Sequence, residues 1–294
     1  MKQKNHRLNS VSAGTEAVMN VVLALFSLCC IIPFIFVVII SFSSEESIRQ
    51  VGYSFFPVEF SSKAYQFLWN ERDTILNALL ISVAVTCIGT LLGLSVTTAM
   101  GYALSRPNFK LKQFYTWVIF IPMLFSGGLV PTYLVVSGLG LIDTLWALVL
   151  PSAISTYNMV LMRNFFQSVP DSLYEAASID GENMVGYLFH FLLPLSGAAI
   201  ATITLFYAVG YWNDYFKSLI YIRDNNLWPM QTVLRQALQT SQFNNMMYED
   251  AAQTLAPESL KDAMIVVTVL PVLCIYPFIQ KYFVKGVMVG SLKG

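Results

Sequence analysis

Stretches without Asp, Glu, Lys or Arg occupy most of this chain, and they constrain its fold more than any other feature. A helix needs about 20 apolar residues to cross a bilayer, where every backbone polar group must be paired within the segment. Six stretches reach or approach this length. They are residues 17–44, 74–105, 113–142, 144–162, 183–213 and 263–280. The sequence therefore predicts an all-α, polytopic membrane protein with six transmembrane helices.

The composition supports the same class. Hydrophobic residues make up 56% of the 294 residues and charged residues only 12%, with a mean hydropathy of +0.60. A soluble domain carries about 25% charged residues. The four cysteines lie inside apolar runs without metal-ligand spacing, so we interpret them as lipid-facing or packing residues. We expect no metal, no cofactor and no nucleic-acid partner.

The N-terminal residues resemble the start of a signal peptide, because Lys2, Lys4 and Arg7 precede an apolar run. That run is too long for the apolar part of a signal peptide, and no small-residue cleavage site ends it. We therefore expect an uncleaved first transmembrane helix.

The basic residues predict the orientation, because cytoplasmic loops are enriched in Lys and Arg. With six spans, both termini lie on one side of the membrane. Ten of the 17 Lys and Arg residues fall on that side and seven on the other. Both termini and the polar segment between the fourth and fifth spans are therefore predicted to be cytoplasmic. The expected location is the plasma or inner membrane, with multiple crossings.

Two longer loops, residues 43–73 and 217–261, face outside in this topology. The middle of the second loop is amphipathic, with Val233, Leu234 and Leu238 near helical spacing, which predicts short surface helices. Neither loop is long enough to form a separate domain.

Small residues mark special points within the spans. Gly89 and Gly93 form a small-xxx-small pair that allows close helix packing. Ser126-Gly127-Gly128, flanked by Pro122 and Pro131, predicts that the third span is bent or locally unwound. Irregular backbone at membrane depth occurs only against protein or a water-filled cavity, so this point indicates either a solute path or a packing kink.

Residues 169–195, VPDSLYEAASIDGENMVGYLFHFLLPL, form a structured polar insert between two apolar runs. Asp171 follows Pro170 and is expected to cap a helix that ends at Gly181, a residue that tolerates positive φ. A second short helix is expected from Glu182. The pattern predicts a two-helix knob for docking to another protein, and a solvated loop is the alternative.

The spans contain no set of residues for chemistry or for ion coupling. No nucleophile–base pair, zinc-binding helix motif or phosphate-binding glycine loop is present, and His190 is interpreted as an interfacial residue. Carriers driven by protons or ions usually bury charged residues at mid-membrane, and these spans have none. Energy for transport would therefore come from elsewhere.

The knob closely resembles the EAA motif of the membrane subunits of binding-protein-dependent ABC importers, through EAASIDG followed by Leu-Pro-Leu at the same spacing. Other segments, including WNDYFKSLIYI, resemble carbohydrate-uptake permeases over nearly the whole chain. The subgroup is that of the oligosaccharide permeases LplC and YtcP and of the maltose permease G subunit. The sequence departs from the family pattern at Glu182, Asn183, Val185 and Gly186.

The resemblance implies a type I importer (MetI-like) permease fold that hydrolyses nothing itself. It implies two ABC ATPase subunits, a homologous second permease that forms a heterodimer with this chain, an extracellular solute-binding protein and a sugar substrate, with the chain embedded in the lipid bilayer. The implied division is a cytoplasmic N-terminus (1–16), a first helix with its outer loop (17–73), a permease core (74–281) and a cytoplasmic tail (282–294). We name residues 169–195 the EAA segment.

Candidate site residues follow from the resemblance and from the span pattern. The expected ATPase-coupling residues are Glu175, Ala176, Ala177, Asp180, Gly181, Leu193 and Pro194. The expected contacts with the binding protein at the outer mouth are Trp212, Asn213 and Asp214. The candidate pore residues are Ser126, Tyr133, Tyr157 and Asn158. A stand-alone secondary carrier or channel for a small polar solute and an intramembrane enzyme are the competing hypotheses.

Overall fold

The computed structural model describes residues 13–247 and 258–291. Within these residues it contains helices and no β-strand, apart from one isolated bridge between Ser43 and Phe60. The predicted all-α class is confirmed. The described residues divide into two compact units, one formed by residues 13–70 with 258–267 and the other by residues 71–247 with 268–291.

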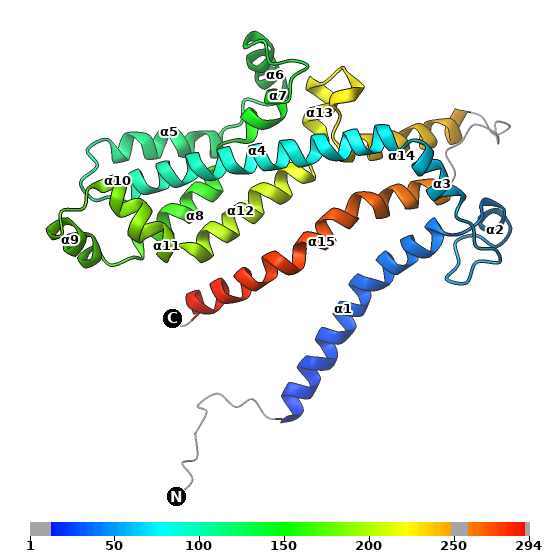
Figure 1. Ribbon diagram of the computed structural model, residues 1–294, viewed down its shortest axis with the longest axis horizontal. Helices are drawn as coiled ribbons and strands as arrows, with labels where there is room; N and C mark the ends of the chain where they lie inside the picture. Colours follow the sequence, from blue (N-terminus) through cyan, green and yellow to red (C-terminus); the bar gives the residue numbers. More distant parts are fainter. Residues whose placement is uncertain (1–12, 248–257, 292–294) are drawn as a thin grey trace, which may run out of the picture. The chain divides into compact units, whose positions relative to one another are not determined.

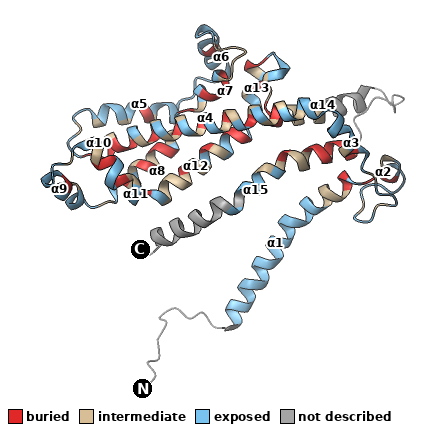
Figure 2. Ribbon diagram, in the orientation of Figure 1, coloured by how far each residue is buried: buried red, intermediate tan, exposed pale blue. Residues whose placement is uncertain are grey.

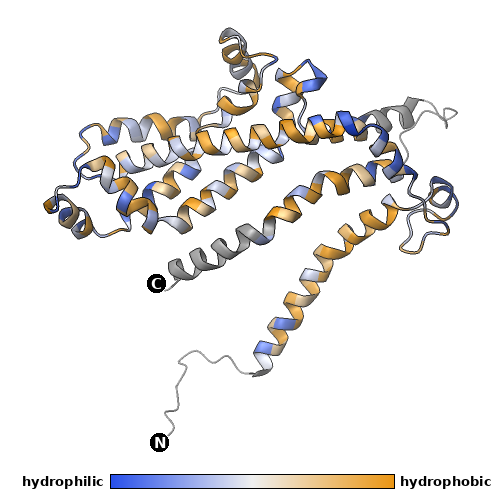
Figure 3. Cartoon of the chain, viewed as in Figure 1, coloured by the Kyte–Doolittle hydropathy of each residue, from blue (hydrophilic) through white to orange (hydrophobic). Residues whose placement is uncertain are grey.

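The first unit begins with α1 (Ala13–Ser41), which covers most of the predicted first span. Its side chains are exposed along most of its length (Figure 2) and are mainly apolar (Figure 3). An all-round apolar and exposed helix of this length fits a lipid environment, because water would not solvate it.

The rest of this unit consists of elements that come after α1 in the sequence. It contains α2 (Glu45–Val51), α3 (Lys63–Asn70) and the first turns of α15 (Glu258–Ser291). At the start of α15, Lys261 forms an ion pair with Glu258. Burial, followed by the nearby charge of Glu258, raises the pKa of the Asp262 carboxyl to about 6. The first turns of α15 therefore carry a partly buried group of charged residues just before the predicted sixth span.

The second unit is built on α4 (Arg72–Ser105), the predicted second span. Two helices, α8 (Thr156–Gln167) and α12 (Gly197–Trp212), run alongside it (Figure 1). A stripe of small residues on α4 makes this approach close. A Cβ atom at Gly89 would lie 2.5 Å from the Tyr211 ring, and one at Gly93 would lie 2.8 Å from the Tyr207 ring. The predicted close packing at Gly89 and Gly93 is confirmed.

The predicted third span is broken, as its Ser-Gly-Gly sequence suggested. It consists of α5 (Lys112–Leu124) and α6 (Leu129–Gly138), separated by four residues that include Gly128 at φ +84°. Left-handed backbone of this kind is accessible to glycine without a steric penalty, so the break coincides with the residue that permits it.

The predicted fourth span is not one continuous helix. It consists of α7 (Trp146–Val149), a 3₁₀ turn (Leu150–Ser152) and α8. Pro151 cannot donate a backbone hydrogen bond, and the Ser155 side chain caps α8 by accepting from the Asn158 N–H at 3.3 Å. These two residues end one helix and begin another, so the single 144–162 helix was wrong.

The predicted fifth span is bent. Residues Met184–Leu195, comprising α10 (Met184–Tyr187), a π-helical turn (Leu188–Leu192) and α11 (Leu193–Leu195), meet α12 at 84°. Pro194, which has no backbone N–H to donate, and the turn at Ser196 lie at the bend.

The expected surface helices are present in the described part of the long 217–261 loop. They are α13 (Phe216–Tyr221), a 3₁₀ turn (Asn225–Leu227) and α14 (Met230–Met247). The sixth predicted span falls within α15, which is longer than residues 263–280. By length and composition, the described residues provide two spanning helices, α1 and α4, or three if the bent pair counts as one. Six crossings therefore stay a prediction.

Candidate functional site

A pocket of about 490 Å³ lies where α8 begins and α12 ends. We call it the tyrosine pocket. Its lining residues are Pro151, Ser152, Ile154, Ser155, Tyr157, Asn158, Phe206, Tyr207, Gly210, Tyr211 and Lys217. The volume is within the range of about 300–1,000 Å³ that is usual for small-molecule sites. Two of the candidate pore residues, Tyr157 and Asn158, belong to it.

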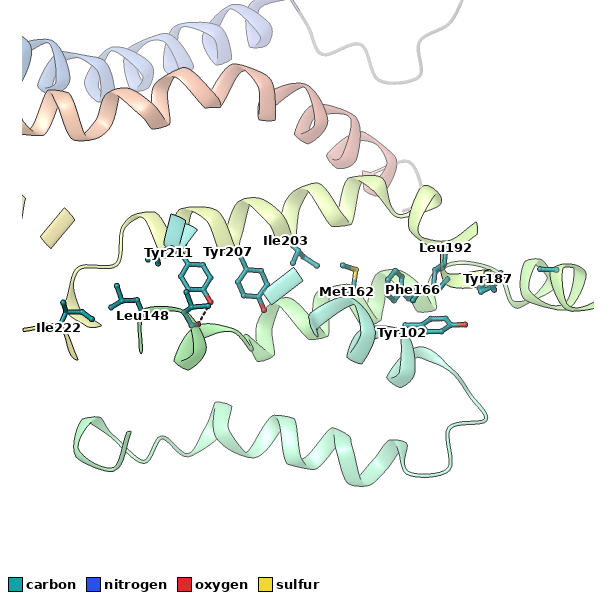
Figure 4. Packing of buried hydrophobic residues seen from close by; sticks show 14 residues of the cluster. Tyr102, Leu148, Met162, Phe166, Tyr187, Leu192, Ile203, Tyr207, Tyr211 and Ile222 are labelled. Carbon is teal, nitrogen blue, oxygen red and sulfur yellow. Dashed lines mark hydrogen bonds between the residues drawn. The ribbon is translucent and has the colours of Figure 1, made fainter. Parts of the chain in front are cut away.

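Two buried tyrosines of α12 fix the inner wall of the pocket. The Tyr207 hydroxyl lies 2.7 Å from the Thr97 hydroxyl and accepts the Ser155 N–H at 3.1 Å. The Tyr211 hydroxyl donates to the Val149 carbonyl at 2.9 Å. Their rings lie side by side at 6.4 Å between centroids (Figure 4). These bonds tie α4, α8 and α12 together, so the wall is a rigid part of the core.

The outer wall is aromatic and accessible. Tyr157 is 58% exposed and Phe206 is 39% exposed, with ring centroids 6.1 Å apart. Asn158, beside them on α8, is only 5% exposed. The pocket thus presents aromatic faces together with an amide and the Ser155 cap at a helix N-terminus.

Among the described residues that line the pocket, Lys217 is the only charged one. It forms an ion pair with Asp214, and both side chains are 22% exposed. Its ammonium lies 5.9 Å from the centroid of the Tyr211 ring. A partly buried cation therefore stands next to the rigid tyrosine wall.

The other two candidate pore residues do not reach this pocket. The Ser126 hydroxyl accepts the Gly128 N–H at 3.2 Å in the break between α5 and α6. Tyr133, on α6, stacks on Tyr221 at 6.1 Å between centroids. Ser126 is paired within its own turn and Tyr133 is stacked on a residue of α13, so neither lines the tyrosine pocket.

The three expected outer-mouth residues have different surroundings. Trp212 is 8% exposed, so its side chain belongs to the protein interior and not to an accessible contact surface. Asn213 is exposed and receives a 3.4 Å hydrogen bond from Gln231. Asp214 is held by Lys217. Asn213 is therefore the exposed member of the three, and their expected contact with the binding protein stays a prediction.

The EAA segment forms the expected helix, glycine turn and helix. The first helix is α9 (Asp171–Ile179), followed by Gly181 at φ +86°. Asp171 is the first helical residue and makes no side-chain cap, because Pro170 occupies the cap position. The next helix starts at Met184 rather than Glu182, and the Asn183 side chain caps it by accepting the Gly186 N–H at 2.8 Å.

Most of the expected coupling residues lie on the surface of this segment. Glu175, Ala176 and Asp180 are exposed, and Ile179 is 86% exposed. Ala177 is different, because it is 3% exposed and packs in the main hydrophobic cluster. Its small size suits the packing of the chain's own core, and its expected contact with an ATPase stays a prediction.

The remaining coupling candidates lie at the bend before α12. Leu193 is half-buried against the main cluster and Pro194 is exposed. They shape the path of the chain rather than extend the surface of α9.

A buried arginine that sequence reasoning missed connects α4 to the EAA segment. Arg106 is 7% exposed, and its guanidinium carbon lies 4.8 Å from the Tyr102 ring centroid, 5.2 Å from that of Tyr174 and 5.1 Å from that of Tyr187. The Tyr102 hydroxyl also donates to the Met184 carbonyl at 2.8 Å. We call Arg106 and the three tyrosines the arginine cluster.

The available sequence signal for this cluster is weak. Arg106 is the first charged residue after a 32-residue uncharged run, at positions 74–105, and it precedes a proline. Such a residue is normally interpreted as the basic flank of a span. Nothing in the sequence pairs it with tyrosines 68 and 81 positions further along.

The fold and these two regions define a helical membrane protein with a pocket lined by aromatic and polar residues and a separate, largely exposed helical segment. Residues 9–289 match the family described as the binding-protein-dependent transport system inner membrane component, and the chain belongs to that family. It is a membrane permease component of ABC importers and not an enzyme.

Several relatives resemble it over most of their length. The polygalacturonan/rhamnogalacturonan transport system permease protein YtcP of Bacillus subtilis is 45% identical over 92% of this chain and 96% of its own. Protein LplC of the same organism is 42% identical over 90% of both chains. A chain in the crystal structure of a bacterial ABC transporter involved in the import of the acidic polysaccharide alginate shares 30% identity, with a TM-score of 0.80 over 94% of this chain and 99% of that one.

Proposed function

We propose that this chain carries an oligosaccharide across the membrane through the tyrosine pocket, and that the EAA segment transmits ATP-driven movement to it. The observation that carries this proposal is the connection between the two regions. α8 begins at the pocket and ends four residues before α9, while α12 begins at the bend after α11 and ends at the pocket. A helix of 12 residues spans about 18 Å, so a displacement of the EAA segment reaches the pocket through two short rigid rods.

The expected partners follow from this arrangement. Two ATPase subunits would supply the movement, one of them seated on the exposed face of α9. A homologous second permease would complete the path, and an extracellular binding protein would deliver the sugar. Both termini and the EAA segment would then be cytoplasmic, and Asn213 with the α13–α14 region would face the binding protein. The names of the relatives support a carbohydrate as the solute.

The mechanism is a switch between two states of the permease pair. ATP-bound ATPases close and bind one arrangement of the EAA segments better than the other, which shifts the population from inward-open to outward-open. Because the energy is external, the spans need no buried proton- or ion-coupling charges of their own.

The proposal is tested with the complex purified from its native membrane and reconstituted in vesicles. We expect sugar uptake that requires ATP and the binding protein. Uptake by the lone chain driven by an ion gradient would support the stand-alone carrier instead.

The docking role of α9 is tested by Ile179→Asp, which places a charge on its most exposed apolar side chain. We expect the ATPase subunits to be lost on purification, while the two permeases stay together. Leu173→Asp is the matched control, since Leu173 is a less exposed residue of the same helix at 37%. Retention of the ATPases by Ile179→Asp would place the docking surface elsewhere.

A further inference from the structure

We propose that the tyrosine pocket binds a sugar ring that carries a carboxylate, a uronate unit, and that Lys217 holds the carboxylate. The inference rests on the proposed function, since it assumes that the pocket lies on the solute path. It goes further by naming the chemical class of the solute and the residue that selects it.

The aromatic wall suits one face of a pyranose ring. The C–H-rich face of such a ring is apolar enough to stack on an aromatic side chain, and aromatic side chains combine a large apolar area with few degrees of freedom. Tyr157 and Phe206 supply two neighbouring rings, 6.1 Å apart and both accessible. Tyr157 also has a hydroxyl at its edge.

The polar lining suits the hydroxyl groups of the ring. The Asn158 amide has two donors and one acceptor, and the hydroxyls of Ser152 and Ser155 can donate or accept. A pocket with few polar groups at fixed positions orients a ligand rather than merely enclosing it. Tyr207 and Tyr211, pinned to the core, keep these groups in place.

The charge of the pocket favours an anion over a neutral ring. In the part of the chain that the structure describes, Lys217 is the one ionic side chain of the lining and none of the lining residues is acidic. The N-terminus of α8, a 12-residue helix, opens at Ser155 and adds partial positive charge on the same side. Partial burial of the ammonium reduces screening by water and salt, which strengthens its attraction for a carboxylate.

Asp214 should weaken the attraction between Lys217 and a solute carboxylate. Its ion pair with Lys217 stabilises the cation in the absence of solute, but an ammonium has three N–H donors and can hold a second acceptor. The negative charge of Asp214 opposes the incoming carboxylate. Lys217 and Asp214 should therefore have opposite effects on acidic sugars, a relationship that a purely structural ion pair would not produce.

The experiment compares ATP-driven uptake of two probes of equal size by the reconstituted complex. The probes are trigalacturonate and its methyl ester, which keeps the rings and linkages but has no carboxylate charge. Because Lys217 contributes a charge-assisted contact, Lys217→Met should raise the KM for trigalacturonate about tenfold and leave that for the ester unchanged. Lys217→Arg should restore most of the loss, and Asp214→Asn should lower the KM for trigalacturonate.

Arg223→Met is the matched control, because Arg223 is an exposed cation of the same loop that does not line the pocket. Affinity of the isolated binding protein for each probe is measured separately, so that its selectivity is not attributed to the pocket. If Lys217→Met does not assemble, Asp214→Asn still tests the charge effect, because it should lower the KM for trigalacturonate and leave that for the ester unchanged.

The outcomes separate the two proposals. Equal effects of Lys217→Met on both probes, or KM changes of the same sign in Lys217→Met and Asp214→Asn, would overturn the carboxylate site. ATP-dependent uptake of neutral sugars alone would also overturn it and leave the proposed function intact. Absence of ATP-dependent uptake for every sugar would overturn the proposed function itself.

Discussion

The arginine cluster and the tyrosine pocket use the same kinds of side chain in opposite ways. In the cluster, three tyrosine rings close around the buried Arg106, and the Tyr102 hydroxyl is bonded to the EAA segment. In the pocket, Tyr157 and Phe206 leave their faces accessible beside about 490 Å³ of space. One region keeps a fixed geometry between helices, and the other leaves room for a solute.

The difference between the two regions predicts which property of the transporter a substitution in each region should alter. A cation held by three aromatic rings loses much of its stabilisation when one of the elements moves alone, so we expect the cluster to move as a body with the EAA segment. The pocket has one fixed wall, made by Tyr207 and Tyr211, and one accessible wall. Changes in the shared core should damage both regions, changes in the cluster should affect coupling, and changes in the pocket should affect the solute alone.

The largest effect is expected where the two regions share a core. Gly93→Leu would place a side chain against the Tyr207 ring, which cannot move away without breaking its contacts with Thr97 and Ser155. Overpacking should lower the free energy of unfolding by about 3 kcal/mol. Thermal unfolding of the purified complex measures this loss, and both ATP coupling and solute binding should decline with it.

Gly138→Leu is the control for this first prediction, because a Cβ at Gly138 meets nothing within 4 Å. A loss of stability as large in Gly138→Leu as in Gly93→Leu would show that added volume at any glycine is harmful, and would remove the close contact from the explanation.

The next effect separates the two regions. Arg106→Met keeps the apolar stem but removes three cation–ring contacts, which at a buried site should weaken the link between α4 and α9 by about 2 kcal/mol. We expect the assembled complex to keep its basal ATP hydrolysis and to lose stimulation by the sugar-loaded binding protein. Both rates are measured on the same preparation.

Lys110→Met is the matched control, since it removes an exposed positive charge four residues away that is not part of the arginine cluster. Arg106→Lys should recover part of the coupling. Normal stimulation in Arg106→Met would mean that the cluster is a packing feature with no part in transmission.

The exposed residues of the EAA segment were easier to predict from the sequence than the buried contacts that hold the segment in place. Exposed residues such as Glu175 and the turn at Gly181 follow from local pattern, because caps and positive φ are properties of a few neighbouring residues. Arg106 and Tyr187 are 81 positions apart, and a tyrosine inside an apolar run looks like any other hydrophobic residue. The link between them appears only after the helices are packed.

The dependence of long-range contacts on helix packing also explains which residues of the tyrosine pocket could be predicted from the sequence. Ser126 and Asn158 were candidates from the third and fourth spans, and Tyr133 and Tyr157 were candidates because aromatic rings can stack on sugars. Tyr157 and Asn158 line the pocket, whereas Ser126 and Tyr133 contact other residues instead. Lys217 was assigned to an outer loop by its charge. The turn after α12 that carries it to the pocket depends on tertiary packing and not on sequence periodicity.

A smaller effect tests the turn in the EAA segment. Gly181 adopts φ +86°, and Gly181→Val would force a β-branched residue into left-handed backbone at a cost of about 1–2 kcal/mol. We expect weaker stimulation of ATP hydrolysis, because α9 would change its angle to α10. Gly140→Val imposes similar strain at φ +67° outside both regions and should leave the stimulation unchanged.

The smallest effect should be confined to the pocket. Tyr157→Ala removes one accessible aromatic face and should cost about 1 kcal/mol of solute binding, which appears as a several-fold higher KM for uptake. Tyr157→Phe keeps the face and should behave almost like the wild type. Basal ATP hydrolysis and its maximal stimulation should be unchanged in both, since Tyr157 lies outside the arginine cluster. If Tyr157→Ala instead lowered the maximal stimulation with an unchanged KM, the pocket would be part of the transmission path, and the division between a region that transmits and a region that binds would not hold.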